Sequence, residues 1–162
     1  MASPATDLTH LLGELAAAGV RFVVVGGLAA VAQGAPIATF DVDIVHQRSD
    51  DNVHRLLEVL ARLNARYRGR PGSPPLSPTL DILRGPGHSL LMTDLGPLDV
   101  LGAIEEGLDY PQLVARANAV DLGGHQILVL DLAEIVRLKR GSSHPKDLLA
   151  LPVLEETLRR RG

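Results

Sequence analysis

Three features of the sequence predict an α/β (α+β) fold, a mixed β-sheet with helices packed mainly on one face. Short apolar, β-branched runs alternate with longer segments whose apolar residues recur at helical spacing. Glycine, proline and aspartate separate these segments, as is usual at turns and helix ends. Apolar residues make up 46% of the 162 residues, which is enough for one ordinary core. We therefore expect one domain over residues 1–162, with a C-terminal helical segment at about 131–160.

The chain is expected to begin with a helix, a strand and a second, short helix. Four leucines at helical spacing predict the first helix, which Gly19 ends: Leu8, Leu11, Leu12 and Leu15. The run RFVVV at 21–25 predicts a buried strand, because β-branched residues favour strands. Helix formers over 28–33 predict the short helix, which Gly34 and Pro36 close.

A second strand, a long helix and a surface loop are expected next. The strand is predicted over 40–45, with three apolar side chains facing the core: Phe40, Val42 and Ile44. Asp50 or Asp51 is expected to cap a helix that runs to about Asn64. Its inner face carries Val53, Leu56, Leu57, Leu60 and Leu63. The segment RYRGRPGSPPLSP at 66–78 is dense in proline, glycine and arginine, which predicts a loop.

The second half is expected to contain two strands, a helix, a hairpin and two more helices. The first five of these elements are predicted at 88–92, 98–101, 110–117, 119–122 and 126–130. Gly123-Gly124 predicts the hairpin turn. Asp131 with Glu134 resembles a capping box that opens a helix to about Arg140, and a last helix is expected over 146–160.

Composition excludes several classes of protein. The formal net charge of −3 argues against a broad nucleic-acid footprint, and 2% aromatic residues leave few stacking surfaces for single strands. The absence of cysteine excludes disulfides and thiolate metal sites. No apolar run approaches the length of a membrane span, and MASPATDLTH lacks the pattern of a signal peptide. We therefore expect a cytoplasmic protein with no membrane partner.

Asp41 and Asp43 are unusual, because aspartate is depleted in strands. Alternate residues of a strand share a face, so the two carboxylates would lie roughly 7 Å apart on one side. Like charges that close raise each other's pKa unless a cation lies between them. Mg²⁺ prefers carboxylate oxygens and leaves positions open for phosphate. The alternative is an edge strand with a solvated face, on which two aspartates discourage aggregation.

Two further features favour the metal site. Gly26 and Gly27 join a buried strand directly to a helix, where glycine allows close approach of a ligand and free N–H groups favour phosphate. Asp99 lies inside another apolar strand, and we prefer it to Asp94, which falls in a turn. Three carboxylates can hold two metal ions about 3.5–4 Å apart, which suits in-line phosphoryl transfer.

These residues together resemble the core motif of the DNA polymerase β-type nucleotidyltransferase superfamily. That motif has Gly-Gly or Gly-Ser at the start of a helix, then Asp-x-Asp on a strand, and a third Asp on a later strand. The stretch VVVGGLAAVAQGAPIATFDVDIV is similar to small bacterial members, including those associated with toxin–antitoxin pairs. Leu138-Lys139-Arg140 and Pro145-Lys146-Asp147-Leu148 extend the resemblance, which covers about residues 8–155.

The resemblance implies transfer of a nucleoside monophosphate from a nucleoside triphosphate such as ATP to an acceptor hydroxyl, with release of pyrophosphate. Asp41 and Asp43 would bind Mg²⁺ (or Mn²⁺) and the triphosphate, and Asp99 would join the metal that activates the acceptor, acting as a general base. Gly26 and Gly27 would cradle the β- and γ-phosphates. The acceptor would be an RNA 3′ end, a protein hydroxyl or a small molecule. Because 162 residues are few for a separate acceptor-recognition domain, we expect a homodimer or a partner protein to complete that site.

Additional nucleotide contacts are expected from Thr39, Lys139 and Lys146. Thr39 belongs to the stretch Ile37-Ala38-Thr39-Phe40-Asp41, where relatives often carry Arg-x-Thr-x-Asp. The basic residue is absent here, which implies loss of a phosphate or substrate contact. Each lysine is equally well explained as a phosphate ligand or as a solvated helix end. Asp147 is expected to cap the last helix or to pair with a neighbouring lysine.

Two other functions remain open from the sequence. The first is a catalytically weak or inactive binding partner with the same fold, antitoxin-like or regulatory, and the second is a structural metal-binding domain without nucleotide. The six histidines show no zinc spacing, and His46 is expected to be structural more often than near the site. Arg66, Arg68 and Arg70 are interpreted as a solvated loop rather than as guides for an anionic acceptor.

Overall fold

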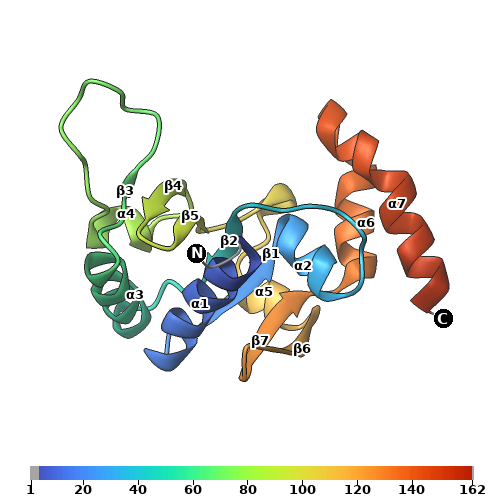
Figure 1. The fold of residues 1–162 in the computed structure, drawn as a ribbon, viewed down its shortest axis with the longest axis horizontal. Coiled ribbons are helices and arrows are strands. Elements are labelled where there is room, and N and C mark those ends of the chain that lie inside the picture. Colours follow the sequence, from blue (N-terminus) through green and yellow to red (C-terminus); the bar gives the residue numbers. More distant parts are fainter. Residues whose placement is uncertain (1–3, 162) are drawn as a thin grey trace.

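A computed structural model describes residues 4–161. Its strands are β1 (Phe22–Val25), β2 (Val42–His46), β3 (Arg66–Tyr67), β4 (His88–Thr93), β5 (Gly96–Leu101), β6 (Ala117–Leu122) and β7 (His125–Leu130). Its helices are α1 (Pro4–Ala17), α2 (Gly26–Ala32), α3 (Asp50–Arg62), α4 (Leu80–Arg84), α5 (Tyr110–Val114), α6 (Leu132–Arg140) and α7 (Pro145–Arg161), with a 3₁₀ turn, η1, at Glu105–Gly107. The predicted fold class is confirmed (Figure 1).

The seven strands form one mixed sheet in the order β3-β4-β5-β2-β1-β7-β6. β1 pairs antiparallel with β2 and parallel with β7, and β2 pairs parallel with β5. The β4–β5 and β6–β7 hairpins extend the two ends. β1 lies between β2 and β7, and all four of its residues are buried, which fits its uninterrupted apolar sequence. The third aspartate strand, β5, is therefore a direct neighbour of β2.

The core is almost entirely aliphatic, as the scarcity of aromatic residues requires. The four leucines of α1 are buried, and α1 contacts β5, β6, β7 and α3. α3 buries Val53, Leu56, Val59 and Leu60, which are spaced three or four residues apart along one face. No helix within residues 4–161 is both long enough and apolar enough to cross a membrane.

Several helix and strand boundaries predicted from the sequence are wrong. β2 begins at Val42, so Phe40 lies outside the strand and is exposed rather than in the core. α3 takes Ser49, not Asp50 or Asp51, as its N-cap residue. The predicted loop at 66–78 contains β3, and the short helix α4 follows it. The helix expected to reach 117 ends at Val114, because the following residues join the β6–β7 hairpin.

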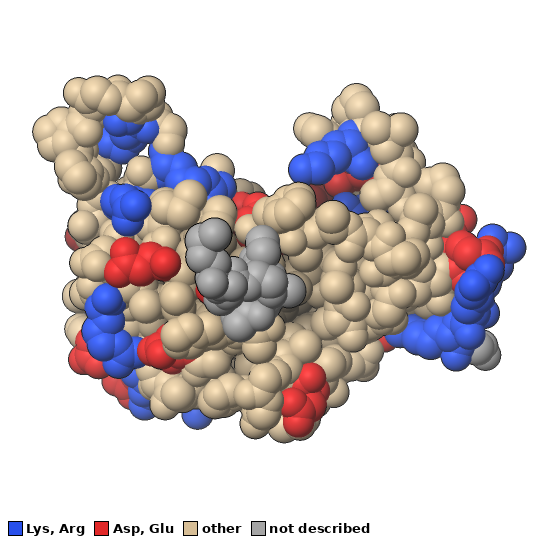
Figure 2. Space-filling view, viewed as in Figure 1, with Lys and Arg blue, Asp and Glu red and all other residues tan. Residues whose placement is uncertain are grey.

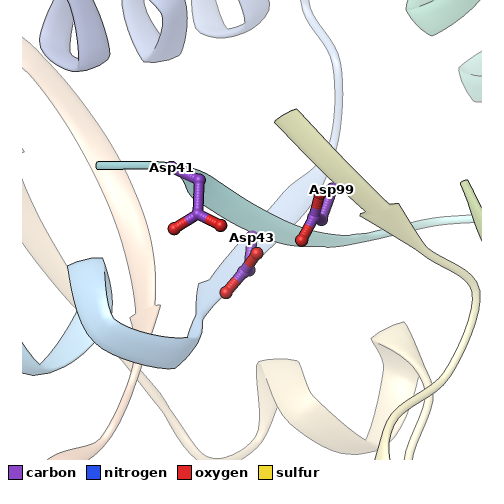
Figure 3. A group of neighbouring side chains, drawn as sticks. All are labelled: Asp41, Asp43 and Asp99. Atoms are coloured by element: carbon purple, nitrogen blue, oxygen red, sulfur yellow. The ribbon is translucent and has the colours of Figure 1, made fainter. Parts of the chain in front are cut away.

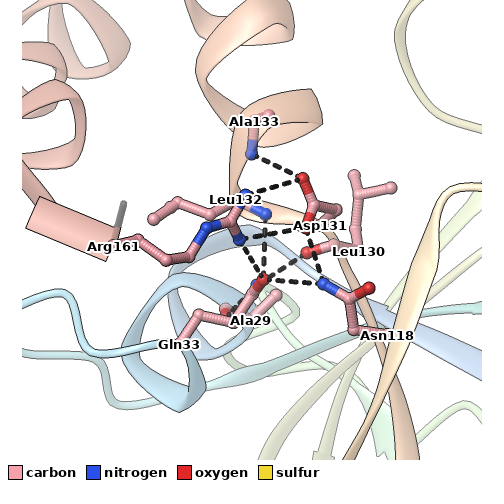
Figure 4. Close-up of polar contacts among 8 residues, drawn as sticks. All are labelled: Ala29, Gln33, Asn118, Leu130, Asp131, Leu132, Ala133 and Arg161. Carbon is pink, nitrogen blue, oxygen red and sulfur yellow. Dashed lines mark hydrogen bonds and ion pairs between the residues drawn. The ribbon is translucent and has the colours of Figure 1, made fainter. Parts of the chain in front are cut away.

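A polar network attaches the C-terminal end of α7 to the rest of the fold (Figure 4). Asp131 caps α6 by accepting from the Ala133 N–H at 2.9 Å, as the sequence predicts. The same carboxylate pairs with Arg161 of α7 at 3.0 Å and accepts from Asn118 at 2.6 Å. Gln33 accepts from the Leu132 N–H at 2.9 Å. The network therefore joins the end of α2, β6, the start of α6 and the end of α7.

Candidate functional site

The sheet register brings the three predicted aspartates together. Asp43 on β2 is the direct partner of Asp99 on β5, and partners in register share a face of the sheet. Asp41 immediately precedes β2. The three side chains point toward one another, and each offers a carboxylate oxygen within 4.8 Å of the others (Figure 3). No other group of three potential metal ligands occurs among residues 4–161.

The surroundings of Asp43 disfavour a bare negative charge. Burial is the main cause that raises its pKa, to about 8. The contact with the Asp99 carboxyl and the negative charges of Asp41 and Asp99 raise it further, while Arg68 lowers it. A carboxyl group that would be protonated near neutral pH when alone is ionised readily beside a divalent cation.

The polar groups around Asp99 satisfy its carboxylate only in part. Arg68 Nη2 forms an ion pair with Asp99 Oδ1 at 2.8 Å, and that buried oxygen accepts no hydrogen bond among the described residues. Arg68 Nη1 instead donates to the Leu91 carbonyl at 2.7 Å. A buried carboxylate oxygen that accepts no hydrogen bond, within a set of three carboxylates, matches the all-oxygen donors that Mg²⁺ or Mn²⁺ requires.

Glycine is required where α2 begins. Gly26 has φ +70°, a conformation that other residues rarely adopt, and a Cβ at this position would collide with the Asp43 carboxylate. A Cβ on Gly27 would lie 3.2 Å from the Thr39 hydroxyl, which donates to the Asp41 carbonyl at 3.4 Å. The turn thus allows the backbone to reach the carboxylate cluster directly.

A cavity of about 800 Å³ opens at the cluster. The three carboxylates, Gly26, Gly27 and Arg68 line one side, and residues of α6 and α7 line the other, including Lys139, Lys146, Ala150 and Leu154. In Figure 2 the molecule is hollowed between the loop after β3 and α7, with Lys and Arg atoms on both walls. A smaller cavity of about 570 Å³ lies between α1 and the β6–β7 turn, away from the carboxylates.

The two predicted lysines differ in their surroundings. Lys139 Nζ lies 3.0 Å from Asp147, which also accepts from the Ser142 hydroxyl at 2.7 Å. The prediction that Asp147 pairs with a lysine is therefore confirmed. Lys146 also lines the cavity and begins the exposed first turn of α7. Both lysines line the cavity and can contact a ligand that fills it. Lys139 would then either keep its ion pair with Asp147 or replace it with the ligand.

His46 is structural, as the sequence favours, whereas Arg68 lies elsewhere than the sequence suggested. His46 is on β2 at odd spacing from Asp43, so it faces away; its Nε2 is 2.6 Å from the Leu83 carbonyl, and burial lowers its pKa. Arg68 was interpreted as part of a solvated loop, but it contacts Asp99. No local pattern marks Arg68, because its contact depends on β3 pairing with β4 at the sheet edge.

No protein-family model and no curated protein matches the sequence. Solved structures do match over nearly the whole chain. The lincosamide antibiotic adenylyltransferase LnuA, in a lincomycin-bound crystal structure, aligns with a TM-score of 0.62 at 12% identity, covering 94% of this chain and 96% of that one. ANT(2″)-Ia, crystallised with adenylyl-2″-tobramycin, gives 0.60 at 14% identity, covering 95% and 88%.

A protein from Thermotoga maritima described as a nucleotidyltransferase gives a TM-score of 0.55 at 20% identity, covering 96% of this chain and 92% of that one. At these identities the similarity establishes the fold. The chain is a small nucleotidyltransferase-fold protein, as the sequence predicts.

Proposed function

We propose that the protein is a metal-dependent nucleotidyltransferase, which moves a nucleoside monophosphate from a nucleoside triphosphate to an acceptor hydroxyl. The observation that carries the proposal is the cluster of Asp41, Asp43 and Asp99 within 4.8 Å, at the mouth of a glycine turn in this fold. Among residues 4–161, Arg68 is the only cation that the contacts pair with the cluster, which leaves negative charge for a divalent cation to neutralise.

The position of each residue in the site suggests its role in metal or phosphate binding. Asp41, Asp43 and Asp99 would hold Mg²⁺ or Mn²⁺, which supplies charge neutralisation on the transferring phosphate. Gly26 and Gly27 offer close backbone approach for the β- and γ-phosphates, with Thr39 beside them. Lys139 and Lys146 would neutralise the departing pyrophosphate from the opposite wall of the cavity.

The reaction forms one bond and breaks one. The acceptor oxygen attacks the α-phosphorus, and the bond from the α-phosphorus to the oxygen bridging to the β-phosphate breaks, so that pyrophosphate leaves. Asp99 would take the proton of the acceptor hydroxyl, since one of its oxygens is buried in the site without a hydrogen bond. Most of the rate enhancement would come from positioning and charge neutralisation.

A small hydroxylated molecule is the acceptor class that the cavity favours. Its volume of about 800 Å³ is within the range of small-molecule sites. LnuA and ANT(2″)-Ia, which have antibiotic ligands in their structures, match over 96% and 88% of their own chains, so this chain has nearly their full fold. An RNA end or a protein hydroxyl is the alternative acceptor, and a partner copy or protein would then extend the site.

The test is transfer of label from each of four nucleoside triphosphates labelled at the α-phosphate. Mg²⁺ is added together with three acceptor pools: small hydroxylated compounds including aminoglycosides and lincosamides, total RNA, and lysate protein. The proposal predicts a labelled product in one pool, and none from the Asp41→Ala, Asp43→Ala double variant. Asp51→Asn, an exposed aspartate on α3, serves as a control that retains activity.

The absence of a basic residue before Asp41 favours one second candidate, a binding partner with weak or no turnover. Such a protein would be stabilised by Mg²⁺ with nucleoside triphosphate in a thermal melt, through linkage, yet would transfer no label. No thermal shift and no transfer together would reject both functions and leave a structural role for the carboxylates.

A further inference from the structure

Phe40 is an aromatic side chain without a place in the core. The chain has two Phe, two Tyr and no Trp. Phe22 is buried, and Tyr67 and Tyr110 pack partly buried against the core. Phe40 is 68% exposed. With so few aromatic residues available, the one exposed ring lies next to the carboxylate cluster.

The position of Phe40 places it at the ligand cavity. It lies between Thr39, which approaches Gly27, and Asp41, the first of the three carboxylates. The segment from Ile37 to Asp41 lines the cavity along its whole length. Burial alternates along this segment, so that Thr39 and Asp41 are half-buried while Phe40 is open to solvent. The Thr39 hydroxyl donates to the Asp41 carbonyl, so the backbone on both sides of Phe40 is tied at the rim of the cavity.

An exposed ring beside a phosphate-binding turn suits a planar ligand. Ligand cavities are lined mainly by apolar and aromatic side chains, with a few polar groups that fix orientation. If the triphosphate lies against Gly26 and Gly27 with its α-phosphate at the carboxylates, its base is the planar group that must project from the cluster. Aromatic side chains stack on bases of every kind, and larger bases stack more strongly.

We propose that Phe40 is the stacking surface for the nucleobase of the nucleoside triphosphate, and that the site therefore prefers purine to pyrimidine nucleotides. This inference rests on the proposed function, since it requires nucleotide in the cavity. It assigns Phe40 to ligand binding rather than to catalysis, because the ring carries no group that moves a proton or holds a cation.

The absence of tryptophan makes a direct test feasible. Phe40→Trp introduces the chain's single tryptophan, whose fluorescence reports a base stacked on it. The ligands are Mg²⁺ with α,β-methylene ATP, in which the scissile oxygen is replaced so that no transfer occurs, its cytidine counterpart, and inorganic tripolyphosphate. Ile82→Trp is the matched control, since Ile82 is 48% exposed on α4 and does not line the cavity.

The adenine analogue should quench Phe40→Trp strongly, the cytidine analogue less, and tripolyphosphate little, while Ile82→Trp should not respond. By calorimetry, Phe40→Ala should bind the adenine analogue about tenfold more weakly than wild type, with tripolyphosphate affinity unchanged. Circular dichroism checks that Phe40→Ala is folded. We expect it to fold, because the exposed Phe40 side chain contributes little to the core.

Three results would overturn the inference. Equal affinity of wild type and Phe40→Ala for the adenine analogue would show that the ring does not contact the base. Equal losses for the analogue and tripolyphosphate would indicate a distorted turn. Failure of wild type to bind any nucleotide would reject the proposed function as well, and so is distinct from the other outcomes.

Discussion

Without metal, Asp43 should make the protein less stable as the pH rises. The folded-state pKa of Asp43 is raised to about 8, whereas its ordinary value is 3.8. Between these values the folded state binds a proton at Asp43 and the unfolded state does not. The stability contributed by this group is therefore fully present below pH 3.8 and is lost as the pH rises through 8.

The magnitude follows from the size of the shift. Each pH unit between the two pKa values removes about 1.4 kcal/mol, so roughly 4 kcal/mol is lost between pH 4 and pH 7. That is a large share of the ~5–15 kcal/mol that stabilises an ordinary domain. Asp43→Asn keeps the shape of a neutral carboxyl but cannot ionise. The variant should match wild type near pH 4 and be the more stable protein at pH 8.

Urea unfolding in EDTA, measured from pH 4 to pH 8 for wild type and Asp43→Asn, gives the difference directly. Titrating groups that do not interact with Asp43, such as His46, act in both proteins and cancel in the difference. Asp51→Asn controls for removal of an exposed aspartate on α3. Adding Mg²⁺ should restore wild type at pH 8 and leave Asp43→Asn unchanged. Parallel pH curves for wild type and Asp43→Asn in EDTA would refute the assignment.

Three further variants test the surroundings of the cluster. Gly26→Ala should lose about 1–3 kcal/mol of stability and most metal binding, because of the positive φ and the collision with Asp43; a melt that matches wild type would contradict this. Arg68→Gln should bind Mn²⁺ several-fold more tightly by electron paramagnetic resonance, since a competing cation is removed; unchanged affinity, or the same gain in the loop control Arg70→Gln, would contradict it. Asp131→Ala should lower the free energy of unfolding in urea by about 1–2 kcal/mol, because the α6 cap and the Arg161 contact disappear together. A loss of stability equal to that of Arg161→Ala alone would exclude a contribution from the cap.

The carboxylate cluster could be predicted from sequence because its signals are local. Alternation along the predicted strand puts Asp41 and Asp43 on one side, although in the structure Asp41 immediately precedes β2, and an aspartate within an apolar run marks Asp99. The continuous burial of β1 likewise follows from its β-branched residues. What the pattern leaves undetermined is the pairing of β2 with β5, because register between strands far apart in sequence depends on the whole sheet.

Phe40 and Arg68 show where local signals fail. A single alternating pattern fits both a strand that starts at 40 and one that starts at 42, and only the bend at Asp41 separates them. Arg68 contacts Asp99, 31 positions later, through the β3–β4 and β4–β5 pairings. The two-residue edge strand β3 is too short for the sequence to predict these pairings. α4 was missed because it has five residues, too few to display a helical period.

The most direct test of nucleotidyl transfer compares ATP labelled at the α-phosphate with ATP labelled at the γ-phosphate, each with Mg²⁺ and the acceptor pools. Transfer of a nucleoside monophosphate predicts that the acceptor gains the α label and that the γ label appears only in pyrophosphate. The Asp41→Ala, Asp43→Ala variant should release neither. Transfer of the γ label, or no transfer of either label to any acceptor, would contradict the proposal that this cluster catalyses nucleotidyl transfer.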